Sequence, residues 1–204
     1  MTEYHLLLYG KIKENINKRL SEFSNVPKDK YFYEFCYCIC TPQSKARSAF
    51  EVQRILEERD FYNNPFDPTE ILRFPGRYIR FHNVKSKRLL DAIKFYPLLM
   101  DVLNSDESNF SKRDWIAHNF NGFSFKESSH FLRNIGYRGL AILDRHILRH
   151  LAECGVYSEI PAISSEKQYK KVEEDFLRFS EYTKIPVDEL DLLFWASSTG
   201  EILK

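Results

Sequence analysis

The chain has 204 residues, of which 43% are hydrophobic and 15% aromatic, so it is long enough to bury a full core as one domain. Its formal net charge of +1 excludes a strongly basic chain, and any nucleic-acid binding has to rest on local patches. The sequence shows no signal peptide, no apolar run of membrane-spanning length and no repeat, which predicts a protein of the cell interior without a membrane anchor.

Helical periodicity predominates, and no long alternating pattern predicts a strand, so the predicted fold class is all-α. In the first half, predicted helices cover residues 11–23, 31–40, 44–58 and 85–96, and a further helix is predicted to start at residues 67–70. Pro97 ends or kinks the last of these, and residues 98–102 form a continuation or a separate short turn. In the second half, helices are predicted from residue 111, over 124–136, from residue 144, over 165–182 and over 186–196.

The cysteines do not follow a metal-binding pattern. Cys36, Cys38 and Cys40 alternate within an aromatic segment, which indicates small buried thiols, and Cys154 stands apart. This is neither a CxxC pair nor the four-cysteine loop of an iron–sulfur cluster. Four histidines are interpreted as structural or phosphate-facing, because their spacing to cysteines and acids matches no ligand set: His118, His130, His146 and His150. We therefore predict no metal and no cofactor.

Residues 71–90 form a basic stretch that contains no acidic residue. Such a stretch is either a solvated face or a phosphate-binding surface, and its clustering favours phosphate contact. Its six basic residues are Arg73, Arg77, Arg80, Lys85, Lys87 and Arg88. We predict that Arg80 and Lys85 contact DNA.

Lys126 lies in the first turn of the helix predicted over residues 124–136. Ser124 and Glu127 form a Ser-x-x-Glu capping box, and Gly136 ends the helix. The exposed N–H groups and the dipole at this end disfavour an ammonium and favour the neutral, nucleophilic amine. The alternative is a solvated surface lysine.

Asp144 follows the apolar run at residues 140–143 and precedes a helix, so it is predicted to be an N-cap. Capping alone explains an aspartate there. With Lys126, however, it supplies an amine nucleophile and a carboxylate at two helix N-termini, which suits one site.

Gly122, Lys126 and Asp144 together resemble the helix-hairpin-helix, Gly/Pro-rich, Asp superfamily of DNA glycosylases. The resemblance implies a hairpin over about residues 112–136 that holds DNA backbone through Asn121, Gly122 and Ser124. The sequence departs from the usual hairpin, because Asn121 and Ser124 stand where proline and a second glycine are common.

Residues 125–136 and 140–148, with the final Lys204, more closely resemble the archaeal-type 8-oxoguanine DNA glycosylase/AP lyases, the second Ogg class. The resemblance covers the whole chain as one domain, residues 1–204, and implies two helical subdomains with the active-site cleft between them. It also implies a monomer in the cytoplasm, associated with the nucleoid, that acts on double-stranded DNA containing oxidised guanine. Lys126 would form a Schiff base, and Asp144 would stabilise positive charge on the sugar.

The resemblance assigns further roles around the flipped base. Gln43 would fill the gap in the duplex, Trp195 would stack on the base, and the terminal Lys204 would line the base pocket. The alternatives are a polar turn residue at 43, a core tryptophan at 195 and a frayed terminus at 204. Apart from the resemblance, Phe81 and His82 lie inside the basic stretch and are candidates for the opposite wall. Two alternatives stay open: a glycosylase/lyase for another oxidised base, and a non-catalytic helix-hairpin-helix module in which Lys126 only contacts phosphate.

Overall fold

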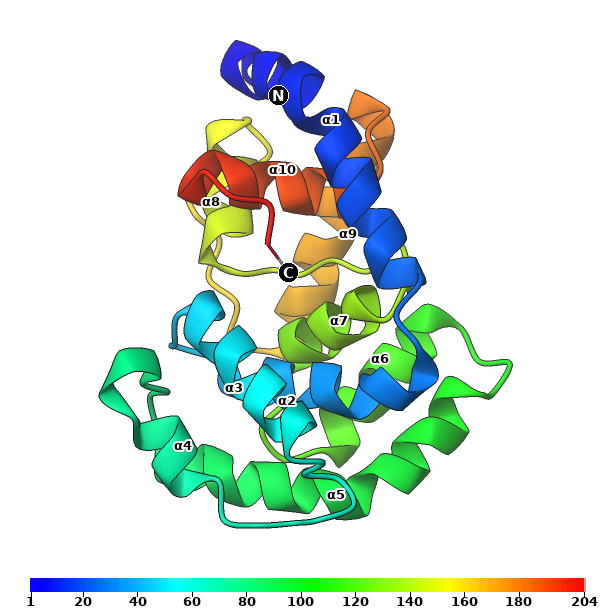
Figure 1. The fold of residues 1–204 in the computed structure, drawn as a ribbon. Coiled ribbons are helices and arrows are strands. Elements are labelled where there is room, and N and C mark those ends of the chain that lie inside the picture. Colours follow the sequence, from blue (N-terminus) through cyan, green and yellow to red (C-terminus); the bar gives the residue numbers. More distant parts are fainter. Residues whose placement is uncertain (204) are drawn as a thin grey trace. The chain divides into compact units, whose positions relative to one another are not determined.

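The computed structural model describes residues 1–203, and every regular element in this part of the chain is a helix, as predicted (Figure 1). The chain forms two units. Unit 1 contains residues 1–25 and the segment from residue 132 to the C-terminus, and unit 2 contains residues 26–131. The boundary falls inside helix α7 (Phe125–Asn134).

Unit 1 is built around α10 (Val187–Thr199), which packs against α1 (Glu3–Ser24), α8 (Arg145–Glu153) and α9 (Glu166–Thr183) (Figure 1). The central place of α10 follows from its sequence, because a helix that is apolar on most faces has to be covered on most faces. Its buried apolar residues are Val187, Leu190, Leu192, Leu193, Phe194 and Ala196.

Helix α1 begins earlier than the predicted residue 11. The hydroxyl of Thr2 caps the helix by accepting a hydrogen bond from the backbone N–H of His5. Apolar periodicity does not reveal these first turns, because Tyr4, Leu6 and Leu7 are exposed and the buried residue is His5.

Unit 2 is built around α2 (Tyr31–Cys40), which follows the 3-10 turn η1 (Lys28–Lys30) and packs against α3 (Ala46–Glu58) and α5 (His82–Leu103). Every residue of α2 after Tyr31 is buried, so the predicted burial of Cys36, Cys38 and Cys40 is confirmed. The short elements α4 (Thr69–Arg73) and η2 (Pro75–Arg77) connect α3 to α5, and α6 (Asn109–Asn119) leads to α7.

Helix α5 continues through Pro97 to Leu103, so the residues after the proline are a continuation of the helix. Proline in a helix interior leaves the carbonyl four residues earlier, here that of Ile93, without its usual partner. Pro97 lies on the exposed side of α5, where water can solvate such a carbonyl. The proline is tolerated there for this reason.

None of the helices formed by residues 1–203 combines the length and apolar character that a bilayer-spanning segment needs.

Candidate active site

The turn between α6 and α7, residues 120–124, forms the predicted hairpin. The backbone N–H of Phe123 donates to the carbonyl of Phe120 at 3.2 Å, and both phenyl rings are buried against each other and against Phe35. Gly122 has a φ of +114°, a conformation that favours glycine. The aromatic anchors fix the turn and leave Asn121 and Ser124 exposed.

Arg88 of α5 lies against this turn. A Cβ atom on Gly122 would stand only 2.4 Å from Arg88 Nε, so the guanidinium occupies the space that a side chain would take. In the sequence, Arg88 is one member of the basic stretch and gives no signal for this contact. Its position adds a cation at the hairpin, where a DNA phosphate is expected to bind.

The N-terminus of α7 places Lys126 beside a buried carboxylate. The backbone N–H of Ser124 donates to Glu127 Oε2 at 3.1 Å, which is one half of the predicted capping box. Lys126 Nζ lies 2.7 Å from Glu127 Oε1, and the Lys126 side chain is 30% exposed. Burial would raise the pKa of Glu127, but Lys126 and Ser124 together hold it below its ordinary value. The amine is thus partly accessible and paired with an anion.

The extended segment before Asp144 is buried, and side chains of unit 1 bind its backbone. Gly139 N–H donates to Asp188 Oδ2, Ala141 N–H donates to Glu173 Oε1, and the Tyr169 hydroxyl donates to the Ala141 carbonyl. A buried backbone needs such partners, because an unpaired N–H or C=O away from water is costly. These bonds fix the strand-like entry to α8 and therefore the position of Asp144.

Asp144 caps α8, as predicted. Its Oδ1 accepts hydrogen bonds from the N–H groups of His146 at 2.8 Å and Ile147 at 2.9 Å. Both of these bonds use Oδ1, so Oδ2 is the oxygen that remains for a ligand. Capping and a chemical role are therefore compatible in one carboxylate. Lys126 belongs to unit 2 and Asp144 to unit 1.

A buried ion pair lies near Asp144. Arg133 Nη1 lies 3.3 Å from Asp191 Oδ2, and both side chains are nearly inaccessible. Burial raises the pKa of Asp191 to about 7; Arg133 opposes the rise, and the nearby carboxylates of Asp144 and Asp188 add to it. Arg133 is thus one of the positive charges within a cluster of acids, and Arg138 is another, because both lower the pKa of Asp188. Arg133 and Asp191 are far apart in the chain, and no local pattern could have paired them.

His146 links Trp195 to Asp144, because its ring contacts Trp195 and its backbone N–H donates to Asp144. The Trp195 ring meets the His146 ring edge-on, with 5.2 Å between their centroids. Trp195 is half-buried, and its indole N–H is buried without a hydrogen-bond partner among the described residues. Within unit 1 the structure therefore brings together Asp144 and the aromatic residue predicted to stack on a base.

The predicted DNA contacts Gln43, Arg80 and Phe81 lie on two connected loops of unit 2. Gln43 and Phe81 are exposed and have φ values of 56° and 60°, which residues other than glycine rarely adopt. The loops are joined by the Arg80 N–H, which donates to Ser44 Oγ at 3.0 Å. The Arg80 guanidinium covers the Phe81 ring at 5.0 Å. His82 follows and is half-buried, with its ring edge against Tyr78.

The prediction that Lys85 contacts phosphate is wrong. Its side chain is 2% exposed, and Nζ donates to the carbonyls of Cys40 at 2.8 Å and Pro42 at 2.6 Å and to Ser44 Oγ at 3.3 Å. The ammonium thereby satisfies acceptors at the end of α2 and in the Gln43 loop. Lys85 is a positioning residue for this loop, and the basic stretch has one fewer charge for DNA.

The burial of Lys85 makes stability depend on pH in a defined direction. Burial lowers the pKa of Lys85 to about 8, from an ordinary value of 10.5 that applies to the unfolded chain. Between these two pH values the unfolded chain binds more protons, so stability rises with pH and is lost as pH falls through 8. We expect the unfolding free energy of the wild type to rise by about 2 kcal/mol, relative to that of Lys85→Met, from about pH 7 to about pH 9.5. Urea unfolding at both pH values measures this difference. Lys87→Met, which changes an exposed lysine, is the control. If Lys85→Met and the wild type show the same dependence of stability on pH, the prediction is wrong.

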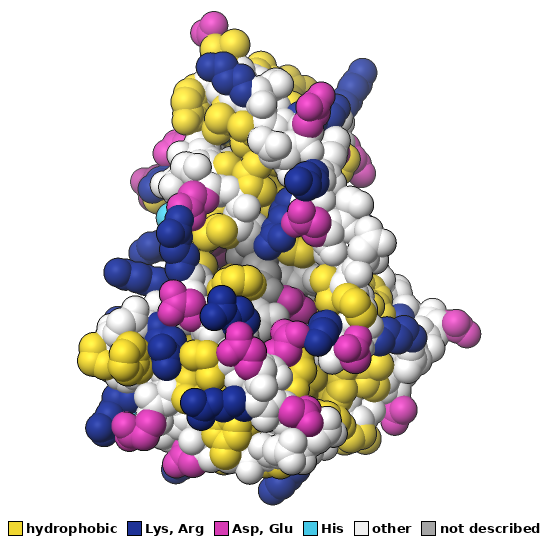
Figure 2. All heavy atoms as spheres, in the orientation of Figure 1, with side chains coloured by type: hydrophobic (Ala, Val, Ile, Leu, Met, Phe, Trp, Pro, Cys, Tyr) yellow, Lys and Arg dark blue, Asp and Glu magenta, His cyan; other side chains and the backbone are white. Residues whose placement is uncertain are grey.

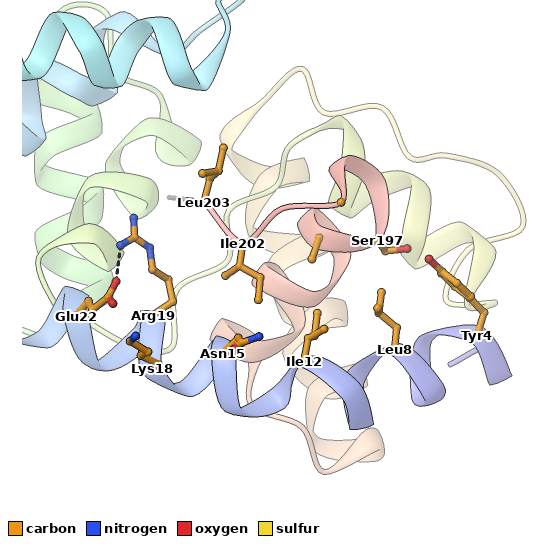
Figure 3. Close-up of a pocket in the computed structure, with 12 residues that line it drawn as sticks. Tyr4, Leu8, Ile12, Asn15, Lys18, Arg19, Glu22, Ser197, Ile202 and Leu203 are labelled. Carbon is orange, nitrogen blue, oxygen red and sulfur yellow. Dashed lines mark hydrogen bonds and ion pairs between the residues drawn. The ribbon is translucent and has the colours of Figure 1, made fainter.

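The described end of the chain lines a cavity of about 680 Å³ in unit 1 (Figure 3). Its walls come from α1, from the end of α10 and from Ile202 and Leu203. Ala196 and Ser197, which follow Trp195, also line it. Figure 3 shows Arg19 and Glu22 paired at one end of the cavity. The predicted role of Lys204 lies outside the described residues.

Surface charge is mixed on the face seen in Figure 2, where basic and acidic side chains alternate. This agrees with the small net charge. Contact with an anionic polymer therefore depends on particular sites, such as Arg88 at the hairpin.

Comparison with known proteins supports the interpretation of residues 120–124 as the turn of a helix-hairpin-helix motif. A family model described as 8-oxoguanine DNA glycosylase (Ogg-HhH) matches residues 16–185. The 8-oxoguanine DNA glycosylase/AP lyase of Fusobacterium nucleatum is 38% identical, over 97% of this chain and 94% of that protein. The Methanocaldococcus jannaschii protein of the same name is 34% identical, over 96% and 94%.

Two solved structures are similar over nearly their whole length. The M. jannaschii 8-oxoguanine glycosylase/lyase in complex with a 15mer DNA containing 8-oxoguanine has a TM-score of 0.84 and 32% identity, over 97% of this chain and 96% of that one. The 8-oxoguanine DNA glycosylase of Thermotoga maritima has a TM-score of 0.87 and 27% identity, over 99% and 97%. With its hairpin, its all-helical architecture and these matches, the chain belongs to the 8-oxoguanine DNA glycosylase family and has the helix-hairpin-helix-GPD fold.

Proposed function

We propose that the protein is a bifunctional repair enzyme that excises 8-oxoguanine from DNA and cleaves the abasic site that results. Membership of the glycosylase family carries this proposal, because relatives over nearly the full length are named 8-oxoguanine DNA glycosylase/AP lyase. One relative has been solved with DNA that contains 8-oxoguanine. The substrate in this proposal is duplex DNA.

The chemistry is assigned to Lys126 and Asp144. The Lys126 amine attacks C1′ of the flipped nucleotide, the bond from C1′ to the base breaks, and the base leaves with a proton. Opening of the sugar ring converts the adduct into a Schiff base. Loss of a C2′ proton then expels the 3′ phosphate by β-elimination. The Oδ2 atom of Asp144 stabilises the positive charge that develops on the sugar.

The resting ion pair between Lys126 and Glu127 has a consequence for this chemistry. An ammonium cannot attack, so Lys126 has to lose a proton before it becomes a nucleophile. Glu127 Oε1, at 2.7 Å, holds the amine in place until the substrate arrives. The pair thus positions the lysine at the N-terminus of α7.

DNA binding is assigned to the hairpin and to the two connected loops of unit 2. The backbone of exposed Asn121 and Ser124 and of half-buried Gly122 is assigned to phosphate contact, with Arg88 beside Gly122. Exposed Gln43 fills the gap left by the flipped base, while Arg80 contacts the backbone. Trp195 is assigned to stacking on the flipped base, and Phe81 and His82 are each assigned to contact with that base. The enzyme acts as a monomer on the chromosome, in the cytoplasm.

A lesion panel tests the proposed function. The full chain is incubated with duplexes that carry 8-oxoguanine opposite each of the four bases, and with duplexes that carry oxidised pyrimidines. We expect excision and strand cleavage at 8-oxoguanine, and much slower reaction at pyrimidine lesions. Preferential excision of a pyrimidine lesion would assign a different substrate. Binding of DNA without any excision would show that the protein is a non-catalytic DNA-binding module.

The C-terminal carboxylate is assigned to recognition of the lesion. Guanine has an acceptor at N7, whereas 8-oxoguanine carries a hydrogen there, so a carboxylate distinguishes the two bases. We expect deletion of Lys204, or a short tag after it, to slow 8-oxoguanine excision about tenfold or more, because the N7–H loses its acceptor in a desolvated pocket. Cleavage of a preformed abasic site is the control and should change little. If a tagged chain excises 8-oxoguanine as fast as the untagged chain, the terminus does not recognise the base.

A further inference from the structure

Two histidines from distant parts of the chain meet inside unit 1. His5 Nε2, on α1, lies 3.2 Å from His150 Nδ1, on α8. His150 Nδ1 also lies 2.7 Å from Glu153 Oε2, one turn further along α8. Both imidazoles are buried, at 2% and 4% exposure, while the Glu153 side chain is 47% exposed. One donor atom from each of the three residues falls within a span of 4.8 Å.

The opposite nitrogen of each ring contacts a hydroxyl group. His5 Nδ1 lies 2.7 Å from Thr2 Oγ1, and His150 Nε2 lies 2.8 Å from Ser198 Oγ. Metal-binding histidines usually have a hydrogen-bond partner at the outer nitrogen, which fixes the ring orientation and the tautomer. Here both outer nitrogens have such partners, and the two inner nitrogens face each other.

We propose that His5 Nε2, His150 Nδ1 and the Glu153 carboxylate bind a divalent transition-metal ion of the zinc class, with water as the fourth ligand. In a tetrahedral site with bonds of about 2.0–2.1 Å, neighbouring donor atoms stand roughly 3.3 Å apart. The two histidine nitrogens already have this separation. Glu153 Oε2 is closer than that to His150 and moves out by about half an ångström, as an exposed side chain can.

The surroundings fit a small cation. Arg149 Nε lies 3.5 Å from Glu153 Oε1, so the arginine engages the other carboxylate oxygen and leaves Oε2 for the ion. The Phe194 ring stacks on His150 and meets His5 edge-on, which excludes water from the inner side of the site. Cys154 Sγ is 3.7 Å from the outer nitrogen of His5, not the inner one, and is not a ligand in this arrangement.

A metal ion at this position joins the first turn of α1 to α8, and through Ser198 to the end of α10. The site is structural, because it holds three helices of unit 1 together and contacts no residue assigned to the chemistry. An ion that binds only the folded chain stabilises that chain by mass action. At a free zinc concentration 100 times Kd, the melting temperature should rise by roughly 5–10 °C.

The test uses the full chain without an affinity tag, after dialysis against a chelator. Zn²⁺ is titrated in against a chromophoric competitor, Co²⁺ absorption reports the ligand field, and thermal unfolding is followed with and without Zn²⁺. We expect one Zn²⁺ per chain, a tetrahedral Co²⁺ spectrum and the rise in melting temperature. His5→Gln, which keeps a polar group but loses the imidazole, should weaken binding at least about tenfold.

Two further variants complete the design. Glu153→Gln changes an exposed side chain, so it keeps the fold even where a buried histidine variant does not, and it should also weaken Zn²⁺ binding. Exposed His118→Gln, in unit 2, removes a histidine elsewhere and should bind Zn²⁺ as the wild type does. The proposal is overturned if the wild type shows no saturable binding of one ion, or if either Glu153→Gln or folded His5→Gln retains wild-type affinity and Co²⁺ spectrum.

Discussion

The Lys126→Gln variant should bind 8-oxoguanine DNA and form no covalent adduct with it. Borohydride reduces a Schiff base to a stable amine, so the wild type should be trapped on the lesion strand. Without the amine, the nucleophilic step is lost, and trapping and strand cleavage should fall by about three orders of magnitude or more. Gel analysis of borohydride-treated mixtures measures the adduct, and a binding assay with the same duplex measures affinity.

The fold should survive this change. The ion pair of Lys126 with Glu127 is partly exposed, and pairs of this kind contribute about 0–1 kcal/mol. Glu127 keeps its hydrogen bond from the Ser124 N–H. Lys171→Gln is a matched control, because Lys171 is an exposed lysine on α9 whose amine pairs with Asp175 at 2.8 Å. Wild-type trapping by Lys126→Gln would place the nucleophile on another residue.

The Asp144→Asn variant should fold normally and excise the base at least about 100-fold more slowly. Asparagine is as good an N-cap as aspartate, so the bonds from the His146 and Ile147 N–H groups to Oδ1 can be kept. The substitution removes the negative charge that faces a cationic transition state, and preorganised charges of this kind contribute about two to three orders of magnitude. Single-turnover excision of 8-oxoguanine and thermal unfolding measure the two effects separately.

Another helix cap provides the comparison. Ser165 caps α9 by accepting from the Gln168 N–H, and Ser165→Ala should lower stability by about 1 kcal/mol without changing the rate of excision. Asp144→Asn should show the reverse pattern. If it unfolds early and its folded fraction is fully active, or if it keeps wild-type activity and stability, the carboxylate of Asp144 has no part in the chemistry.

The local features of the fold could be predicted from the residues alone. The boundaries of α2, α9 and α10 were predicted within a few residues from apolar periodicity, with the help of the Ser165 cap at α9. The cap at Asp144 and the link between Ser124 and Glu127 were also predicted, because capping bonds join residues only two to four positions apart. The candidate residues Lys126 and Asp144 came from these local signals and from a family resemblance, and their catalytic roles stay predictions.

The packing of the helices sets which side chains are accessible and which distant groups meet. Lys85 has the sequence context of a DNA contact, yet packing of α5 on α2 buries its ammonium among three acceptors. The backbone before Asp144 takes its partners from α9 and α10, and His5 meets His150 across 145 positions. Periodicity and caps describe a helix and its ends, whereas burial and the pairing of charges depend on the particular faces that helices present to each other. These contacts therefore follow from the packing of the whole chain and leave no local pattern in the sequence.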